Sequence, residues 1–144
     1  MNNILVVCIG NICRSPLAQV ALAHALPDKN VWSAGLDALV GNPADPASVE
    51  LATEQGLDLG EHRAQQITSV MCQQADLILV MEQSHKAELE RRYPLARGRV
   101  FRLGELGGYD IADPYRQGRA AFESASQHIA RGVQDWAPRI RQLG

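Results

Sequence analysis

Short, fully apolar runs separated by longer mixed stretches dominate the pattern of this chain. Residues 4–7 and 77–81 contain no polar side chain. A run that is apolar at every position is typical of a strand buried on both faces, as in a parallel sheet, because a strand with one wet face would alternate. Two shorter runs complete a set of four predicted strands, which are residues 3–7, 31–34, 77–81 and 100–103.

The stretches between these runs predict helices with recognisable ends. Ser15, Asp45 and Thr68 are good N-cap residues, and a proline follows Ser15 and Asp45 directly, where the first helical turn tolerates it. Proline also ends two of the helices, because it cannot continue the hydrogen-bond ladder. The predicted helices span residues 16–26, 46–56, 69–75 and 83–93.

From Arg119 onward, apolar residues recur at steps of three or four, which predicts one face of a long helix. Pro138 predicts a kink or a new helix start within it. Four strands that alternate with helices indicate an α/β fold, a parallel sheet with helices on both faces. In such sheets ligands bind beyond the carboxyl ends of the strands. The apolar face comprises Phe122, Ala125, Ile129, Val133, Trp136, Ile140 and Leu143.

The composition narrows the functional classes. A chain of 144 residues with 46% hydrophobic content fits one domain, residues 1–144. Its net charge of −2 does not favour nucleic acid or an anionic membrane as partner. We expect no signal peptide and no membrane insertion, because the first residues lack a basic segment and the apolar runs are short. Three cysteines, an odd number, suit a reducing cytoplasm better than a disulfide scaffold.

The segment Cys8-Ile9-Gly10-Asn11-Ile12-Cys13-Arg14-Ser15 follows the first apolar run and precedes a predicted helix. A helix N-terminus offers unpaired N–H groups and a partial positive charge, which favour an anion and the thiolate form of Cys8. Gly10 and Asn11 are the residue types that tolerate a left-handed backbone in a tight loop. Arg14 adds a charged fork that suits phosphate oxygens. The segment therefore predicts a nucleophilic cysteine at an oxyanion site.

Cleavage of a phosphate ester also requires a proton for the leaving oxygen, and two Asp-Pro pairs are candidate donors. Asp45 has a sufficient structural role as a helix cap. Asp113 lies in a glycine-rich region and has no evident capping role. The residues alone favour Asp113 only modestly, so both remain candidates on spacing.

The string VCIGNICRSP resembles the phosphate-binding loop of the low-molecular-weight protein tyrosine phosphatases, and the resemblance extends over nearly the whole chain. It includes Ser33-Ala34-Gly35, His62-x-Ala64-x-Gln66-Ile67, Asp76-Leu77-Ile78-Leu79-x-Met81 and Asp113-Pro114-Tyr115. It is strongest to bacterial members that act with tyrosine autokinases in capsule and exopolysaccharide export. The resemblance implies a sheet of order 2-1-3-4 and hydrolysis of phosphotyrosine through a phosphocysteine, with no metal and no cofactor.

The resemblance also implies roles for individual residues. Cys8 is the nucleophile, Arg14 binds the phosphate and Asp113 is the general acid. Cys13 is a partner for a reversible disulfide that shields Cys8 from overoxidation. The amides of Ile9, Gly10, Asn11, Ile12, Cys13 and Arg14 bind phosphate oxygens. The side chains of Asn11, Ser15, Ser33 and His62 hydrogen-bond to one another and support the loop, and those of Ile12, Leu39 and Tyr115 form the substrate pocket.

Several alternatives share parts of this pattern. An arsenate reductase of the same fold needs relay cysteines after the strand at 77–81, where this chain has Met81 and Glu82. Relatives that hydrolyse phosphoarginine carry a threonine where this chain has Ile12. A phosphocarrier needs neither Arg14 nor a general acid, and a silent phosphotyrosine-binding module would have lost Cys8 or Asp113, both of which are present. The other residues carry structural expectations: His24, His85 and His128 lie at the surface or on helix flanks, and Cys72 is inert.

Overall fold

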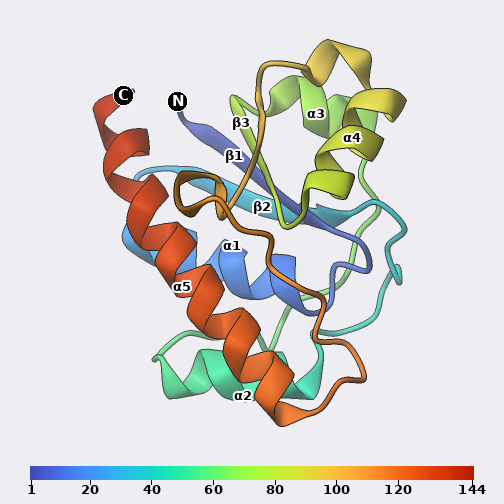
Figure 1. The fold of residues 1–144 in the computed structure, drawn as a ribbon, viewed down its shortest axis with the longest axis vertical. Coiled ribbons are helices and arrows are strands. Elements are labelled where there is room, and N and C mark those ends of the chain that lie inside the picture. The colour runs from blue at the N-terminus through green and yellow to red at the C-terminus, as the bar shows by residue number, and fades with distance from the viewer.

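The computed structural model describes residues 1–144 and contains four strands and five α-helices. Figure 1 traces the chain through them. The strands are β1 (Asn3–Cys8), β2 (Asn30–Gly35), β3 (Leu77–Val80) and β4 (Val100–Arg102). The helices are α1 (Arg14–Ala25), α2 (Pro46–Glu54), α3 (Ser69–Gln74), α4 (Gln83–Arg92) and α5 (Arg119–Gln142).

All strand pairs are parallel and the sheet order is β2-β1-β3-β4, which confirms the predicted topology. Strand β1 lies inside the sheet, with Val7 opposite Val80 on one side and Cys8 opposite Gly35 on the other. Its side chains from Ile4 to Val7 are fully buried, as the unbroken apolar run predicted. Because β1 ends at Cys8, the candidate loop begins at the carboxyl edge of the sheet.

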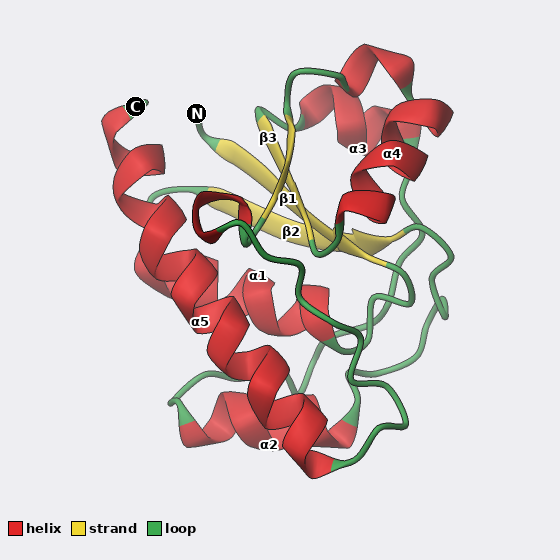
Figure 2. Ribbon diagram, in the orientation of Figure 1, coloured by secondary structure: helices red, strands yellow, loops and turns green.

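Helices cover both faces of the sheet (Figure 2). On one face, alternate residues of β1 and β3 such as Ile4 and Leu79 pack against α1, α2 and α5 in the larger core cluster. On the other face, Leu5 and Ile78 pack under α3 and α4 in a second cluster. This division follows from the two-residue period of a strand, which sends successive side chains to opposite faces.

Helix ends agree with the predicted caps at two positions and differ at a third. Asp45 Oδ1 accepts a hydrogen bond from Ala47 N at 2.9 Å, and Thr68 Oγ1 accepts one from Met71 N at 3.2 Å. The prediction that Ser15 caps α1 was wrong: the helix begins at Arg14, and no side chain caps it. The hydroxyl of Ser15 is instead turned towards the preceding loop.

Helix α5 is continuous through Pro138, so no new helix starts there. The proline is exposed and lies near the carboxyl end, where the carbonyl of Gln134 that it leaves without a partner can be hydrated. No helix of the chain combines the length and the apolar character needed to cross a membrane.

Candidate active site

The loop between β1 and α1 surrounds the thiol of Cys8. Asn11 holds a left-handed backbone with φ of 59°, which turns its N–H back towards the sulfur at 3.3 Å from Cys8 Sγ. The hydroxyl of Ser15 lies 2.9 Å from the same sulfur. Two polar groups therefore face Cys8 Sγ, and both can donate a hydrogen bond to a thiolate.

The side chain of Asn11 holds the loop in this shape. It is fully buried, and its Nδ2 donates to Ser15 Oγ at 2.8 Å and to Ser33 Oγ at 3.0 Å. Its Oδ1 accepts from Gln65 N at 2.9 Å, and His62 Nε2 lies 2.7 Å from its backbone oxygen. The structure thus brings together the four residues that were expected to form this network, and it adds Gln65.

Arg14 is almost completely buried beneath the loop, with 2% of its side chain exposed. Its Nη1 donates to Glu82 Oε2 at 2.5 Å and to the carbonyl of Ile111 at 2.8 Å. Its Nη2 lies 3.8 Å from Asp113 Oδ2. Burial, more than any neighbouring charge, raises the pKa of the Cys13 thiol, so Cys13 is a neutral group beside Arg14.

Asp113 lies on the segment that crosses in front of the loop, and its side chain is 49% exposed. Its Oδ1 accepts a hydrogen bond from Tyr115 N at 3.0 Å, which orients the other oxygen towards Arg14. Asp45, the other candidate acid, is occupied in capping α2. Of the two Asp-Pro pairs, only Asp113 lines the pocket.

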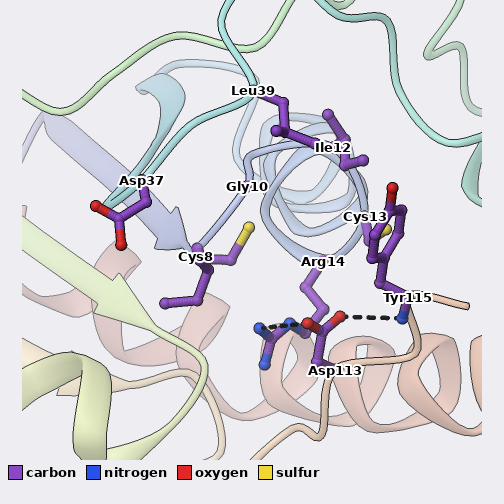
Figure 3. A pocket seen from close by; sticks show the side chains of 10 residues that line it. Cys8, Gly10, Ile12, Cys13, Arg14, Asp37, Leu39, Asp113 and Tyr115 are labelled. Carbon is purple, nitrogen blue, oxygen red and sulfur yellow. Dashed lines mark hydrogen bonds and ion pairs between the residues drawn. The ribbon is translucent and has the colours of Figure 1, made fainter.

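A pocket of about 170 Å³ opens above Cys8 (Figure 3). The view shows Leu39 and Ile12 on one side and Arg14 with Asp113 on the other. The pocket places a thiol, a guanidinium and a carboxyl group around one small volume. These are the functional groups that phosphoryl transfer to sulfur requires. Its lining consists of Cys8, Ile9, Gly10, Ile12, Cys13, Arg14, Asp37, Leu39, Asp113 and Tyr115.

Three residues that contribute to the site were not predicted from the sequence, and neither was the burial of a fourth, His85. Asp37 lines the pocket, Glu82 pairs with Arg14, and Gln65 supports Asn11. No motif marks them, because they lie on three other segments that reach the loop only in the folded chain. His85 was expected at the surface or on a helix flank; it lies in the first turn of α4, but it is buried, and its Nε2 lies 3.4 Å from Glu82 Oε2. His24 and His128 are exposed, as expected.

Comparison with known proteins matches this arrangement over almost the whole chain. The family model described as "low molecular weight phosphotyrosine protein phosphatase" matches residues 3–143. The probable low molecular weight protein-tyrosine-phosphatase EpsP of Ralstonia nicotianae is 56% identical over 144 residues, covering 100% of this chain and 99% of the relative. The structure of Vibrio vulnificus Wzb in complex with benzylphosphonate is 48% identical, with a TM-score of 0.93 and coverage of 96% and 98%.

The fold is shared more widely than the sequence. YwlE, an arginine phosphatase from Geobacillus stearothermophilus, has a TM-score of 0.92 at 28% identity, with 99% of this chain and 95% of that one covered. Fold and site together define a phosphatase whose nucleophile is a cysteine. The chain belongs to the low molecular weight phosphotyrosine protein phosphatase family.

Proposed function

We propose that residues 1–144 form one phosphatase domain that hydrolyses phosphotyrosine in proteins through a phosphocysteine intermediate. The observation that supports this most directly is the constellation in the pocket. Cys8 Sγ lies among inward-facing loop groups, with Arg14 buried beside it and Asp113 3.8 Å from Arg14. Each of the three side chains has a separate task in the transfer of a phosphoryl group.

In the first step, the Cys8 thiolate attacks phosphorus, so an S–P bond forms while the bond from phosphorus to the tyrosine oxygen breaks. The N–H groups of the loop from Ile9 to Arg14 bind the equatorial oxygens, as in other anion nests. The Arg14 guanidinium interacts more strongly as charge spreads over these oxygens in the transition state. Asp113 gives its proton to the departing phenolic oxygen.

In the second step, water attacks the phosphocysteine and the S–P bond breaks. Asp113 is now ionised and takes a proton from that water, which restores both the acid and the Cys8 thiolate. The Ser15 hydroxyl, 2.9 Å from the sulfur, stabilises the returning thiolate by donating a hydrogen bond. No step requires a metal or an organic cofactor.

The shape of the pocket supports an aromatic ester as substrate. Ile12, Leu39 and Tyr115 line its walls, and a phosphate at the Cys8 loop would place a phenyl ring between them. A phosphoserine is too short to fill this space. By the resemblance to bacterial capsule and exopolysaccharide phosphatases, we further propose that the substrate is the tyrosine-rich tail of an autokinase in the cytoplasm, dephosphorylated during polysaccharide production.

The alternatives differ at identifiable positions. Cys72 is buried in the cluster between the sheet and α3, away from the pocket, so it is not placed to relay a disulfide as an arsenate reductase requires. Ile12 narrows the pocket where a phosphoarginine phosphatase has threonine. The decisive experiment compares phosphotyrosine, phosphoserine and phosphoarginine peptides with the purified protein. We expect phosphotyrosine to have the highest kcat/KM, and a higher value for phosphoarginine would contradict the proposal.

A further inference from the structure

A carboxylate from the segment that connects β3 to α4 holds the arginine of the pocket. Glu82 lies two residues after the end of β3, and its Oε2 accepts a hydrogen bond from Arg14 Nη1 at 2.5 Å. The second Nη1 hydrogen goes to the carbonyl of Ile111 at 2.8 Å. A guanidinium Nη atom carries two hydrogens, so these two contacts fully occupy Nη1.

The remaining donor edge of Arg14 is formed by Nε and Nη2. Nη2 is 3.8 Å from Asp113 Oδ2, beyond hydrogen-bond distance, and Arg14 lines the pocket. A bidentate contact with two phosphate oxygens requires two parallel N–H groups such as this edge provides. The contacts at Nη1 therefore determine which edge of the guanidinium meets the ligand.

The side chain of Asp110 takes the capping role that Glu82 could otherwise fill. Glu82 is the N-cap residue of α4, but its side chain makes no capping hydrogen bond. Asp110 Oδ1 accepts the hydrogen bond from Gln83 N instead, at 3.1 Å. The helix end is thus satisfied by a residue of the Asp113 segment, while the Glu82 carboxylate faces Arg14.

His85 lies behind the carboxylate. It is 4% exposed, and its Nε2 is 3.4 Å from Glu82 Oε2, while Nδ1 has no hydrogen-bond partner. An unpaired buried N–H costs more than an unpaired acceptor nitrogen, so this environment favours the tautomer with the proton on Nε2, the ring nitrogen nearest to Glu82.

We propose that Glu82 is a positioning residue that fixes Arg14 so that its Nε–Nη2 edge faces the phosphoryl group, and that His85 acts through Glu82 by holding its carboxylate. The inference rests on the proposed phosphatase function. Glu82 also places a negative charge near an anion site, so it disfavours phosphate in the ground state while it orients the group that stabilises the transition state.

Because Glu82 is proposed to weaken phosphate binding and yet to speed the reaction, its removal should change kcat and phosphate binding in opposite directions. A purely structural role predicts no such opposition. Glu82→Gln keeps the shape and removes the charge. We expect kcat on a phosphotyrosine peptide to fall about 10- to 100-fold, the range that a misplaced catalytic group costs. KM is not expected to rise. Inorganic phosphate should inhibit the variant at least as strongly as the wild type and should raise its Tm by more, because Arg14 has lost its resident anion.

Two further variants distinguish the role of His85 from that of Glu82 and provide a control. His85→Asn should lower kcat about 3- to 10-fold alone and should cost nothing further in the Glu82→Gln background, because it acts through that carboxylate. Glu123→Gln is the matched control: it removes a carboxylate paired with Arg119 at 3.0 Å, outside the pocket, and should leave kcat unchanged. Circular dichroism verifies the fold of each variant.

The outcomes discriminate clearly. A wild-type kcat in Glu82→Gln, or a loss of kcat accompanied by weaker phosphate binding, would overturn the role of Glu82. Additive losses in the double variant would overturn the role of His85. If the wild-type protein does not hydrolyse the phosphotyrosine peptide, the proposed function fails. The comparison of Tm shifts with inorganic phosphate still tests the contact between Glu82 and Arg14, because it needs no turnover.

Discussion

The two loops that meet at the pocket are held in very different ways. The phosphate loop, residues 8–15, is built into the core: Asn11 and Ser15 are fully buried, and Arg14 is almost so. The acid loop, residues 109–118, is largely exposed, and Ile111 anchors it with 0% exposure. The difference is that the groups proposed to bind the phosphate are fixed within the core, whereas the proposed general acid, Asp113, lies on an exposed segment.

The largest effect should come from the sulfur of the phosphate loop. We expect Cys8→Ser to lower kcat by about 10⁴-fold or more, as removal of a nucleophile does in other hydrolases. The loop and Arg14 remain, so inorganic phosphate should still bind and raise Tm. Cys72→Ala changes a cysteine buried away from the pocket and should retain activity. Appreciable turnover by the serine variant would show that Cys8 is not the nucleophile.

Asp113→Asn tests the acid loop by itself. For phenyl phosphate or a phosphotyrosine peptide, whose leaving group has a pKa near 10, we expect a loss of about 10²–10³-fold. For 2,4-dinitrophenyl phosphate the loss should be below about tenfold, since this leaving group needs no proton. Asp45→Asn, in the other Asp-Pro pair, still caps α2 and should behave as wild type. Equal losses on both substrates would remove the acid role from Asp113.

Asn11 tests how firmly the phosphate loop is held. Asn11→Ala removes three side-chain hydrogen bonds in a buried site and should reduce the free energy of unfolding by about 2–4 kcal/mol. Asn11→Gly loses the same bonds but accepts the φ of 59° without strain, so it should be about 1 kcal/mol less destabilised. Urea denaturation measures both, and exposed Asn30→Ala serves as control at below about 0.5 kcal/mol. Equal destabilisation by alanine and glycine would show that the backbone at Asn11 is unstrained.

The phosphate loop could be predicted from the sequence, because the residues that form it are adjacent along the chain. The strand and the loop that follows it lie in thirteen consecutive residues, 3–15, so the apolar run of β1 together with Gly10 and Asn11 was enough to predict the phosphate loop. Ser15 shows the limit: its hydroxyl suits a helix cap, yet the buried Cys8 and Asn11 offer it better partners. The tertiary contacts of Ser15 therefore override its propensity to cap the helix.

Glu82 and His85, by contrast, could not be predicted as parts of the site from the sequence. Both stand in a charged stretch that is typical of a solvated helix, and nothing in their spacing distinguishes them from Glu88 or Lys86. Their burial and their contact with Arg14 follow from the order of the strands, which places the end of β3 beside the end of β1. The resemblance that identified Asp113 carried no corresponding expectation for this pair.

Ile12 tests whether the wall of the phosphate loop selects the substrate. Ile12→Thr should raise the ratio of kcat/KM for phosphoarginine over phosphotyrosine by about tenfold, the discrimination typical of a change of one or two carbons in a pocket. Ile12→Val has the same shape as threonine without the hydroxyl, so it separates space from polarity. An unchanged ratio in both variants would mean that Ile12 does not control the choice.

The smallest expected effect is a pH dependence of stability that comes from His85, the buried histidine behind both loops. Burial, and secondarily the charge of Arg14, lowers the pKa of His85 below its ordinary value of 6.5, although Glu82, Asp110 and Asp113 oppose the shift. A lowered pKa means that the unfolded chain takes up a proton before the folded protein does. The contribution of His85 to stability is therefore fully present above pH 6.5 and declines as pH falls towards the pKa of the folded state.

The effect is best measured as a difference between two proteins, because other groups also titrate. We expect the free energy of unfolding of wild type minus that of His85→Asn to decrease between pH 7 and pH 5, by at most about 1.4 kcal/mol per pH unit. Urea denaturation at half-unit intervals gives the two curves. Parallel curves would show that His85 titrates alike in the folded and unfolded chain, so that burial does not outweigh the opposing charges of Glu82, Asp110 and Asp113.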